Sequence, residues 1–188
     1  MNQAISQRLF SLRNSSAGAI LKSAIIILLG ITVFYVDDRD FFNYRITLGI
    51  IIALSLLKSF YFVSISYQKI LEVSIKNTAY YEFILFMATH IFVIIISFAA
   101  DFFCLVQVDP RSITGINQTA GLFEKAFDCF YFSVLNFSFF GYGDIIPVTI
   151  PAKLILMVEA LLSFMAIILV LSDFISLKES LVDRHRKN

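Results

Sequence analysis

Long apolar runs, separated by short polar stretches, account for most of the chain. Four of these runs reach the roughly 20 residues that a helix needs to cross a bilayer: 17–36, 46–67, 80–103 and 152–176. Polar or charged residues bound each of them. The pattern therefore predicts an all-α membrane protein with four transmembrane helices.

A fifth segment, 121–139, has a different pattern. Its first half mixes charged and aromatic side chains and only its second half is apolar, which suits a short helix that enters from an interface. Gly141 and Gly143 then interrupt helical order, and Pro147 and Pro151 bracket the restart. Backbone that leaves the helix at membrane depth is tolerated only inside protein or along a water-filled cavity. We therefore expect a re-entrant loop here, with an ordinary extracellular loop as the alternative.

Composition supports the membrane assignment and excludes several other classes of protein. Hydrophobic residues make up 59% of the chain and charged residues 15%, against about a quarter charged in soluble domains. A net charge of +1 gives no electrostatic basis for binding nucleic acid. The sequence contains no HExxH-type helix, no paired Asp and no Ser nucleophile with a base partner, so we expect neither an enzyme nor a cofactor.

The two cysteines, Cys104 and Cys129, are too few for a disulfide framework or a zinc site. Both fall on the same predicted side of the membrane, so they either pair in an oxidising compartment or remain as two buried thiols.

The distribution of Lys and Arg predicts the orientation. With the N-terminus in the cytoplasm, eight of the 15 basic residues lie in inner segments and five in outer ones. The outer segments also collect most of the acids, Asp101 and Asp144 among them. We expect a multi-pass protein of the cell membrane with both termini cytoplasmic and the re-entrant loop entering from outside.

The stretch 127–171 reads FDCFYFSVLNFSFFGYGDIIPVTIPAKLILMVEALLSFMAIILVL. It resembles the pore module of potassium channels, in which an outer helix, a pore helix, a filter and an inner helix follow one another. The resemblance covers about 80–176. It assigns the outer helix to 80–103, the pore helix to 121–139, the filter to 139–144 and the inner helix to 152–176.

The resemblance implies a homotetramer that conducts potassium passively, because in that family four filters line one path with carbonyl oxygens. Glycine suits such a filter, since carbonyls pointing inward in succession need alternating left- and right-handed backbone. The C-terminal, partially negative end of the pore helix would also favour a cation. Tyr131 and Phe132 match the rings that brace the filter tyrosine. The implied ion-binding residues, with permeant potassium between them, are Phe139, Phe140, Gly141, Tyr142, Gly143 and Asp144.

The sequence departs from the family pattern at two filter positions. The family's filter reads Thr-Val-Gly-Tyr-Gly, and Phe139 and Phe140 stand at the Thr and the Val. Four Phe139 rings would form a hydrophobic gate of the kind that dewets, and Phe140 would force repacking behind the filter. The alternative to a conducting pore is therefore a non-conducting relative, sealed by Phe139, that acts as a regulatory or interaction subunit. Ser163 aligns with the family's hinge glycine.

Ionisable residues inside spans are functional candidates, each with a partner to be named. We expect Lys58 either to pair with Glu82 or to extend to the membrane surface, with a gating role as the alternative. Glu159 is level with the pore helix and is expected to anchor Asn136 or Ser138 behind the filter. A direct role in a cation site is its alternative.

The remaining segments flank the pore module, 77–177. Residues 1–76 form a predicted two-span hairpin, which either shields the pore from lipid or docks a second membrane protein to give a heteromer. Residues 178–188 form a short cytoplasmic tail.

Overall fold

The computed structural model describes residues 44–76, 80–141 and 143–187. The predicted first span, 17–36, lies outside these ranges, as does Tyr142. The elements of the described part, in chain order, are α2 (Tyr44–Lys76), α3 (Tyr80–Val108), β1 (Ile113–Thr114), α4 (Leu122–Phe137), β2 (Ile146–Pro147) and α5 (Ile150–Lys187).

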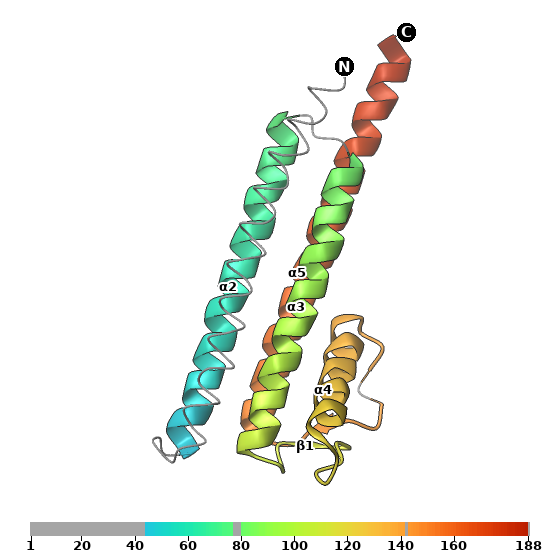
Figure 1. The fold of residues 1–188 in the computed structure, drawn as a ribbon. Helices are drawn as coiled ribbons and strands as arrows, with labels where there is room; N and C mark the ends of the chain where they lie inside the picture. Colours follow the sequence, from blue (N-terminus) through green and yellow to red (C-terminus); the bar gives the residue numbers. More distant parts are fainter. Residues whose placement is uncertain (1–43, 77–79, 142, 188) are drawn as a thin grey trace, which may run out of the picture.

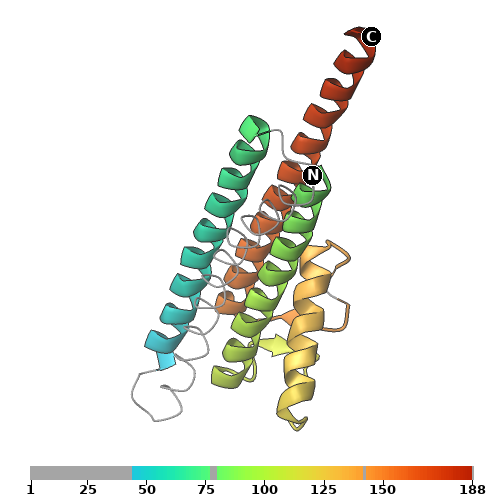
Figure 2. The same cartoon turned by 45° about the horizontal axis from the view of Figure 1, so that its top comes forward.

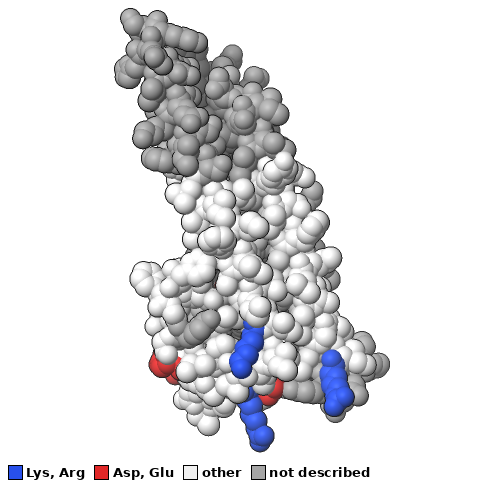
Figure 3. All heavy atoms as spheres, turned by 180° about the vertical axis from the view of Figure 1, so that it is seen from behind, with Lys and Arg blue, Asp and Glu red and all other residues white. Residues whose placement is uncertain are grey.

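Three of the helices are long and apolar enough to cross a membrane: Arg45–Gln68 of α2, Ile84–Val108 of α3 and Ile150–Leu171 of α5. They pack against one another as a bundle (Figures 1 and 2). From behind, the charged side chains of the described surface gather at one end, and the rest of that surface is uncharged (Figure 3). This distribution suits a bundle whose sides lie in lipid. The three predicted spans that fall within the described residues are present.

Helix α4 is too short to cross a bilayer. Its 16 residues give a length of about 24 Å, against about 30 Å for the hydrocarbon core. It lies along one half of α3, at the end of the bundle where β1 lies, and the chain returns from it to the start of α5 (Figure 1). Its buried residues recur at helical spacing: Cys129, Phe132, Ser133, Asn136 and Phe137. One face of α4 therefore packs on α3 and α5.

A small antiparallel ladder, absent from the all-α prediction, closes the end of the bundle. Ile113 pairs with Pro147 and Thr114 with Ile146. The carbonyl oxygen of Ser112 also accepts a hydrogen bond from the Val148 N–H, at 2.8 Å. The ladder joins the segment before α4 to the segment before α5. The chain that enters α4 and the chain that enters α5 are therefore held side by side at this end of the bundle.

The helix ends differ from the predicted ones for local reasons. Helix α3 continues past 103 to Val108, and α4 ends at Phe137, two residues before the predicted end. Helix α5 runs to Lys187, through most of the predicted tail. No Gly or Pro follows Pro151 in the sequence, so nothing in the backbone stops the helix at 176.

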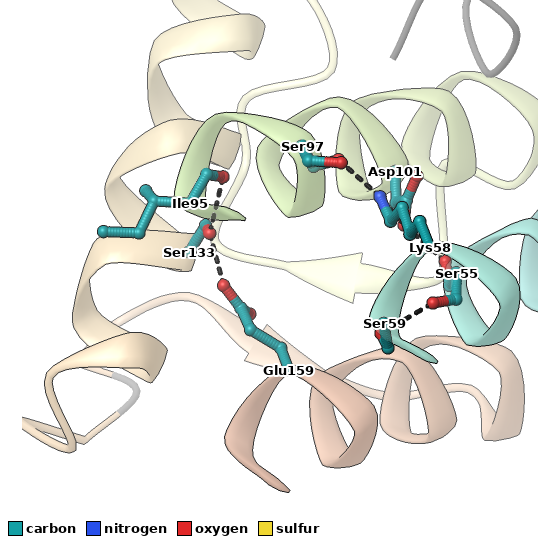
Figure 4. Close-up of polar contacts among 8 residues, drawn as sticks. All are labelled: Ser55, Lys58, Ser59, Ile95, Ser97, Asp101, Ser133 and Glu159. Atoms are coloured by element: carbon teal, nitrogen blue, oxygen red, sulfur yellow. Dashed lines mark hydrogen bonds and ion pairs between the residues drawn. The ribbon is translucent and has the colours of Figure 1, made fainter. Parts of the chain in front are cut away.

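Lys58 of α2 does not pair as predicted. Its Nζ lies 2.5 Å from Asp101 Oδ2 on α3 and donates to the carbonyl oxygen of Ser97, at 2.7 Å. Ser55 donates to the same Asp101 carboxylate (Figure 4). The prediction of Glu82 as the partner assumed a different position of α2 along α3. Asp101, the partner in the structure, lies several helical turns beyond Glu82 on α3. Asp101, placed in an outer loop from the sequence, is instead buried within α3.

This ion pair ties α2 to the pore module. Lys58 and Asp101 are both buried, and Lys58 Nζ also lies 4.6 Å from the centre of the Phe98 ring. Charges inside a membrane bundle are stable only when they are paired and hydrogen-bonded. The surrounding contacts meet that requirement, and they fix how far α2 is shifted along α3.

We predict that Lys58→Met and Asp101→Leu each lower the free energy of unfolding by about 3–5 kcal/mol, because each leaves one buried charge unpaired. The double variant, which removes both charges, is expected to recover most of the loss. Denaturant unfolding in detergent, followed by circular dichroism, measures all three. Lys153→Met, at an exposed position, is the control. Losses that simply add in the double variant would contradict the pairing.

Candidate functional site

The end of α4 folds into a closed turn. The Phe140 N–H donates to the carbonyl oxygen of Leu135 at 3.1 Å, and the Phe139 N–H donates to that of Asn136 at 3.2 Å. These two bonds are those of a Schellman motif, in which the residue after the C-cap adopts left-handed backbone. That residue is Phe139, with φ of 58°. The motif normally has glycine at this position, so a Schellman end could not be predicted from the phenylalanine found here.

Three residues of the loop, each two positions after the last, have left-handed backbone. Phe139, Gly141 and Gly143 have φ of 58°, 95° and 57°. Two of these positions are the glycines for which we predicted alternation, and Phe139 is the addition. Left-handed backbone costs a residue with a Cβ about 1–2 kcal/mol, so surrounding contacts hold Phe139 in place. Alternating handedness turns successive carbonyl groups toward one side, as a carbonyl-lined filter requires.

The last carbonyl groups of α4 are satisfied inside the chain. Ser138 Oγ donates to the carbonyl oxygen of Val134 at 2.6 Å, and Ser163 Oγ of α5 donates to that of Phe137. Ser163, the predicted hinge position, is therefore a buried tie between α5 and the end of α4. The four carbonyls that a helix leaves without intrahelical partners all have donors here.

A buried polar cluster joins α4 to α5 one turn earlier. Asn136 Nδ2 donates to Glu159 Oε2 at 2.6 Å and to the carbonyl oxygen of Leu156 at 3.4 Å. Ser133 Oγ contacts Glu159 Oε1 and, at 3.0 Å, the carbonyl oxygen of Ile95 on α3. Figure 4 shows Ser133 between Ile95 and Glu159. Three helices thus meet at Ser133.

The predicted contact from Asn136 to Glu159 is present, and the one from Ser138 is not. Ser138 donates to its own helix because it lies two residues beyond Asn136, on another face. Ser133 was missed in the sequence, although it lies three residues before Asn136 and so shares its face. That spacing is the signal that identifies it.

The two neighbouring aromatic residues of α4, Tyr131 and Phe132, lie in different environments. Phe132 is fully buried and meets Phe102 of α3 in an edge-to-face contact with ring centroids 4.8 Å apart. It therefore packs α4 against α3, and its bracing of the filter tyrosine stays a prediction. Tyr131 is 41% exposed. Its contact with Tyr142 stays a prediction, because Tyr142 lies outside the described residues.

Where the chain leaves the loop, Gly115 packs against the backbone of Asp144. Gly115 has φ of 92°, and a Cβ added to it would lie 2.2 Å from the Asp144 carbonyl oxygen. The Asp144 side chain is exposed. The ladder of β1 and β2 thus sets the path of the chain as it leaves the loop, while leaving the carboxylate at the surface.

The two phenylalanines at the predicted filter positions project from the chain. Phe139 is 52% exposed and Phe140 is 84% exposed. Phe140 was predicted to pack behind the filter, and in the single chain it has little covering it. Cys104 and Cys129, both within the described ranges, are buried as two separate thiols.

Comparison with known proteins adds one match. The sequence model of the ion channel family matches residues 70–179, which is more than half of the 188 residues. The match covers α3, α4, the loop and the apolar part of α5, and leaves out most of α2. None of the curated proteins or solved structures compared with the chain matches it.

Phe139→Gly is expected to be more stable than Phe139→Ala by about 1 kcal/mol, because only glycine adopts the left-handed region without a steric cost. Both variants remove the ring, so their difference isolates the backbone term. Thermal unfolding in detergent gives the comparison. An alanine variant as stable as the glycine variant would show that Phe139 is not left-handed.

Gly115→Ala is expected to destabilise the protein and the loop exit, since its Cβ collides with backbone that cannot move without breaking the β1–β2 ladder. Gly121→Ala is the matched control, because a Cβ at Gly121 meets nothing within 4 Å. Unfolding temperatures of the two variants should differ clearly. Equal values would contradict the described packing of Gly115 on Asp144.

Proposed function

The chain belongs to the ion channel family, and we propose that it forms a tetrameric pore that conducts potassium selectively and passively. The observation that carries this proposal is the left-handed backbone at Phe139, Gly141 and Gly143, placed directly after a helix too short to cross. In such a pore the carbonyl oxygens of Phe140, Gly141 and Tyr142 replace the water shell of the ion.

The contacts around the loop support this role. The pore helix is fixed to α3 through Phe132 and to α5 through Glu159 and Ser163. Selective coordination requires a backbone that keeps its shape without the ion, and these ties supply that rigidity. Four Asp144 carboxylates at the outer mouth would concentrate cations there.

An uncovered aromatic stripe on α4 supports assembly around an axis. Phe123, Phe127 and Tyr131 follow one another at four-residue spacing and are exposed in the single chain. Positions four apart lie on one helix face. In the proposed homotetramer this face meets the neighbouring subunit, and the exposed Phe140 meets it too. The surrounding bilayer covers the outer sides of α2 and α3.

Phe139 is the basis of a second candidate function. A ring that is half exposed at the inner end of the filter is suited to close the path by dewetting. A non-conducting relative, sealed by Phe139 and acting as a regulatory or interaction subunit, is therefore the second candidate. In the conducting pore the same ring acts as a gate.

The proposal places the protein in the cell membrane with both termini cytoplasmic and the β1–β2 end outside. Helix α2, the second arm of the proposed N-terminal hairpin 1–76, packs on the pore module through the Lys58–Asp101 pair. It is also the surface on which a heteromeric membrane partner would dock.

Purified protein in potassium-loaded liposomes is expected to dissipate an imposed potassium gradient, while the same gradient of sodium persists. A potassium-sensitive dye or electrode follows the flux. The variant Phe139→Thr/Phe140→Val restores the family's filter residues and is expected to conduct faster, because it removes the hydrophobic constriction.

The outcomes separate the two candidates. Flux from the double variant alone would support the sealed relative. No flux from either protein, with both correctly folded by circular dichroism, would contradict a homomeric channel. Empty liposomes and the Gly121→Ala variant are the controls.

A further inference from the structure

Two carboxyl groups are buried in the part of the chain that the structure describes, Asp101 and Glu159. They differ in what surrounds them. Asp101 lies 2.5 Å from a cation, Lys58. Glu159 is fully buried, and the groups that hydrogen-bond to it are the neutral side chains of Ser133 and Asn136.

The two amide protons of Asn136 can each be assigned to one hydrogen bond. Its amide nitrogen carries two N–H groups and contacts two oxygens, the Leu156 carbonyl at 3.4 Å and Glu159 Oε2 at 2.6 Å. A carbonyl oxygen only accepts, so the amide nitrogen, and not the amide oxygen, faces Leu156. Each N–H then has one acceptor, and Glu159 Oε2 accepts from Asn136.

Ser133 has one hydroxyl proton and two oxygen neighbours. Its Oγ lies 3.0 Å from the Ile95 carbonyl oxygen and also contacts Glu159 Oε1 (Figure 4). The Ile95 carbonyl has no proton to give, so Ser133 must donate to Ile95 if both of these contacts are hydrogen bonds. The hydrogen bond between Ser133 and Glu159 then needs a proton on Glu159. An ionised Glu159 would take the Ser133 proton and leave two oxygens facing each other without one.

The charges around Glu159 also favour a protonated carboxyl group. An ionised carboxylate buried at membrane depth is costly unless a cation is beside it. The charged groups that act on Glu159 from α2 and α3 are Lys58 and Asp101, and these two neutralise each other. His90 of α3 is engaged with the carbonyl oxygen of Phe62 at 3.3 Å, and Cys129 of α4 is a buried thiol. None of them supplies a free positive charge.

We propose that Glu159 is a positioning residue that works as a neutral carboxylic acid and that its proton locks the pore helix between α3 and α5. Glu159 donates to Ser133, and Ser133 donates to Ile95. When the pH rises, the Glu159 O–H bond breaks and the proton passes to hydroxide in the solvent. The Ser133 hydroxyl then turns to donate to the new carboxylate, and the bond from α4 to α3 is lost.

The consequence for conduction rests on the function proposed above. Ser133 and Asn136 lie in the last turns of α4, directly before the left-handed Phe139. Releasing α4 from α3 at this point loosens the end of the helix that shapes the filter. The filter is therefore expected to lose its ion-coordinating form at alkaline pH.

Infrared spectroscopy tests the protonation state without depending on conduction. The difference spectrum between the reconstituted wild type and Glu159→Gln at neutral pH should contain the carbonyl stretch of a protonated carboxylic acid. Raising the pH should replace it with carboxylate bands. Carboxylate bands already present at neutral pH would overturn the proposal. Glu124→Gln, which removes an exposed acid of α4, is the control and should lack the acid band.

Potassium flux from liposomes at neutral and alkaline pH tests the coupling. We expect the wild type to lose its flux at the pH at which the acid band disappears. Glu159→Gln donates to Ser133 and accepts from Asn136 at every pH, so its ratio of alkaline to neutral flux should stay near unity. An equal alkaline loss in Glu159→Gln would overturn the coupling. Absence of flux at all pH values would count against the proposed function, while the infrared result would still decide the state of Glu159.

Discussion

Backbone polar groups at membrane depth must find hydrogen-bond partners within the protein, and this constraint shapes the whole site. The last carbonyl groups of helix α4 take donors from the chain itself. Phe139 and Phe140 supply two of these donors through the Schellman turn, and Ser138 and Ser163 supply others. This closure requires left-handed backbone at Phe139, and left-handed backbone recurs at Gly141 and Gly143.

The same requirement explains how the helices are joined. Several polar side chains buried between helices bond to another helix: Lys58 to Asp101, Asn136 to Glu159, and Ser163 to Phe137. Hydrophobic contact alone gives little preference for one helix register over another in lipid, because the alternative environment is equally apolar. The polar contacts therefore define the register of α2 on α3 and the depth of α4, and through them the position of the loop.

Much of this architecture could be predicted from the sequence, and the exceptions have physical causes. Hydropathy located three spans that the structure describes, and the break at Gly141 and Gly143 located the loop. The partner of Lys58 could not be predicted, because it depends on how far α2 is shifted along α3. The β1–β2 ladder is only two residues long on each side, too short for an alternating pattern. A left-handed phenylalanine contradicts local preference, so only the three-dimensional contacts of Phe139 reveal it.

The proposed pore requires that the loop from Phe139 to Gly143 faces a four-fold axis and coordinates potassium. Electron cryomicroscopy of the protein in lipid nanodiscs, prepared in potassium chloride, tests it most directly. The account predicts four copies around one axis, with ion density beside the carbonyl oxygens of residues 140–142 and the Phe139 rings at the inner end. A monomer or dimer, or a ring whose loop carbonyls point away from the axis, would contradict it.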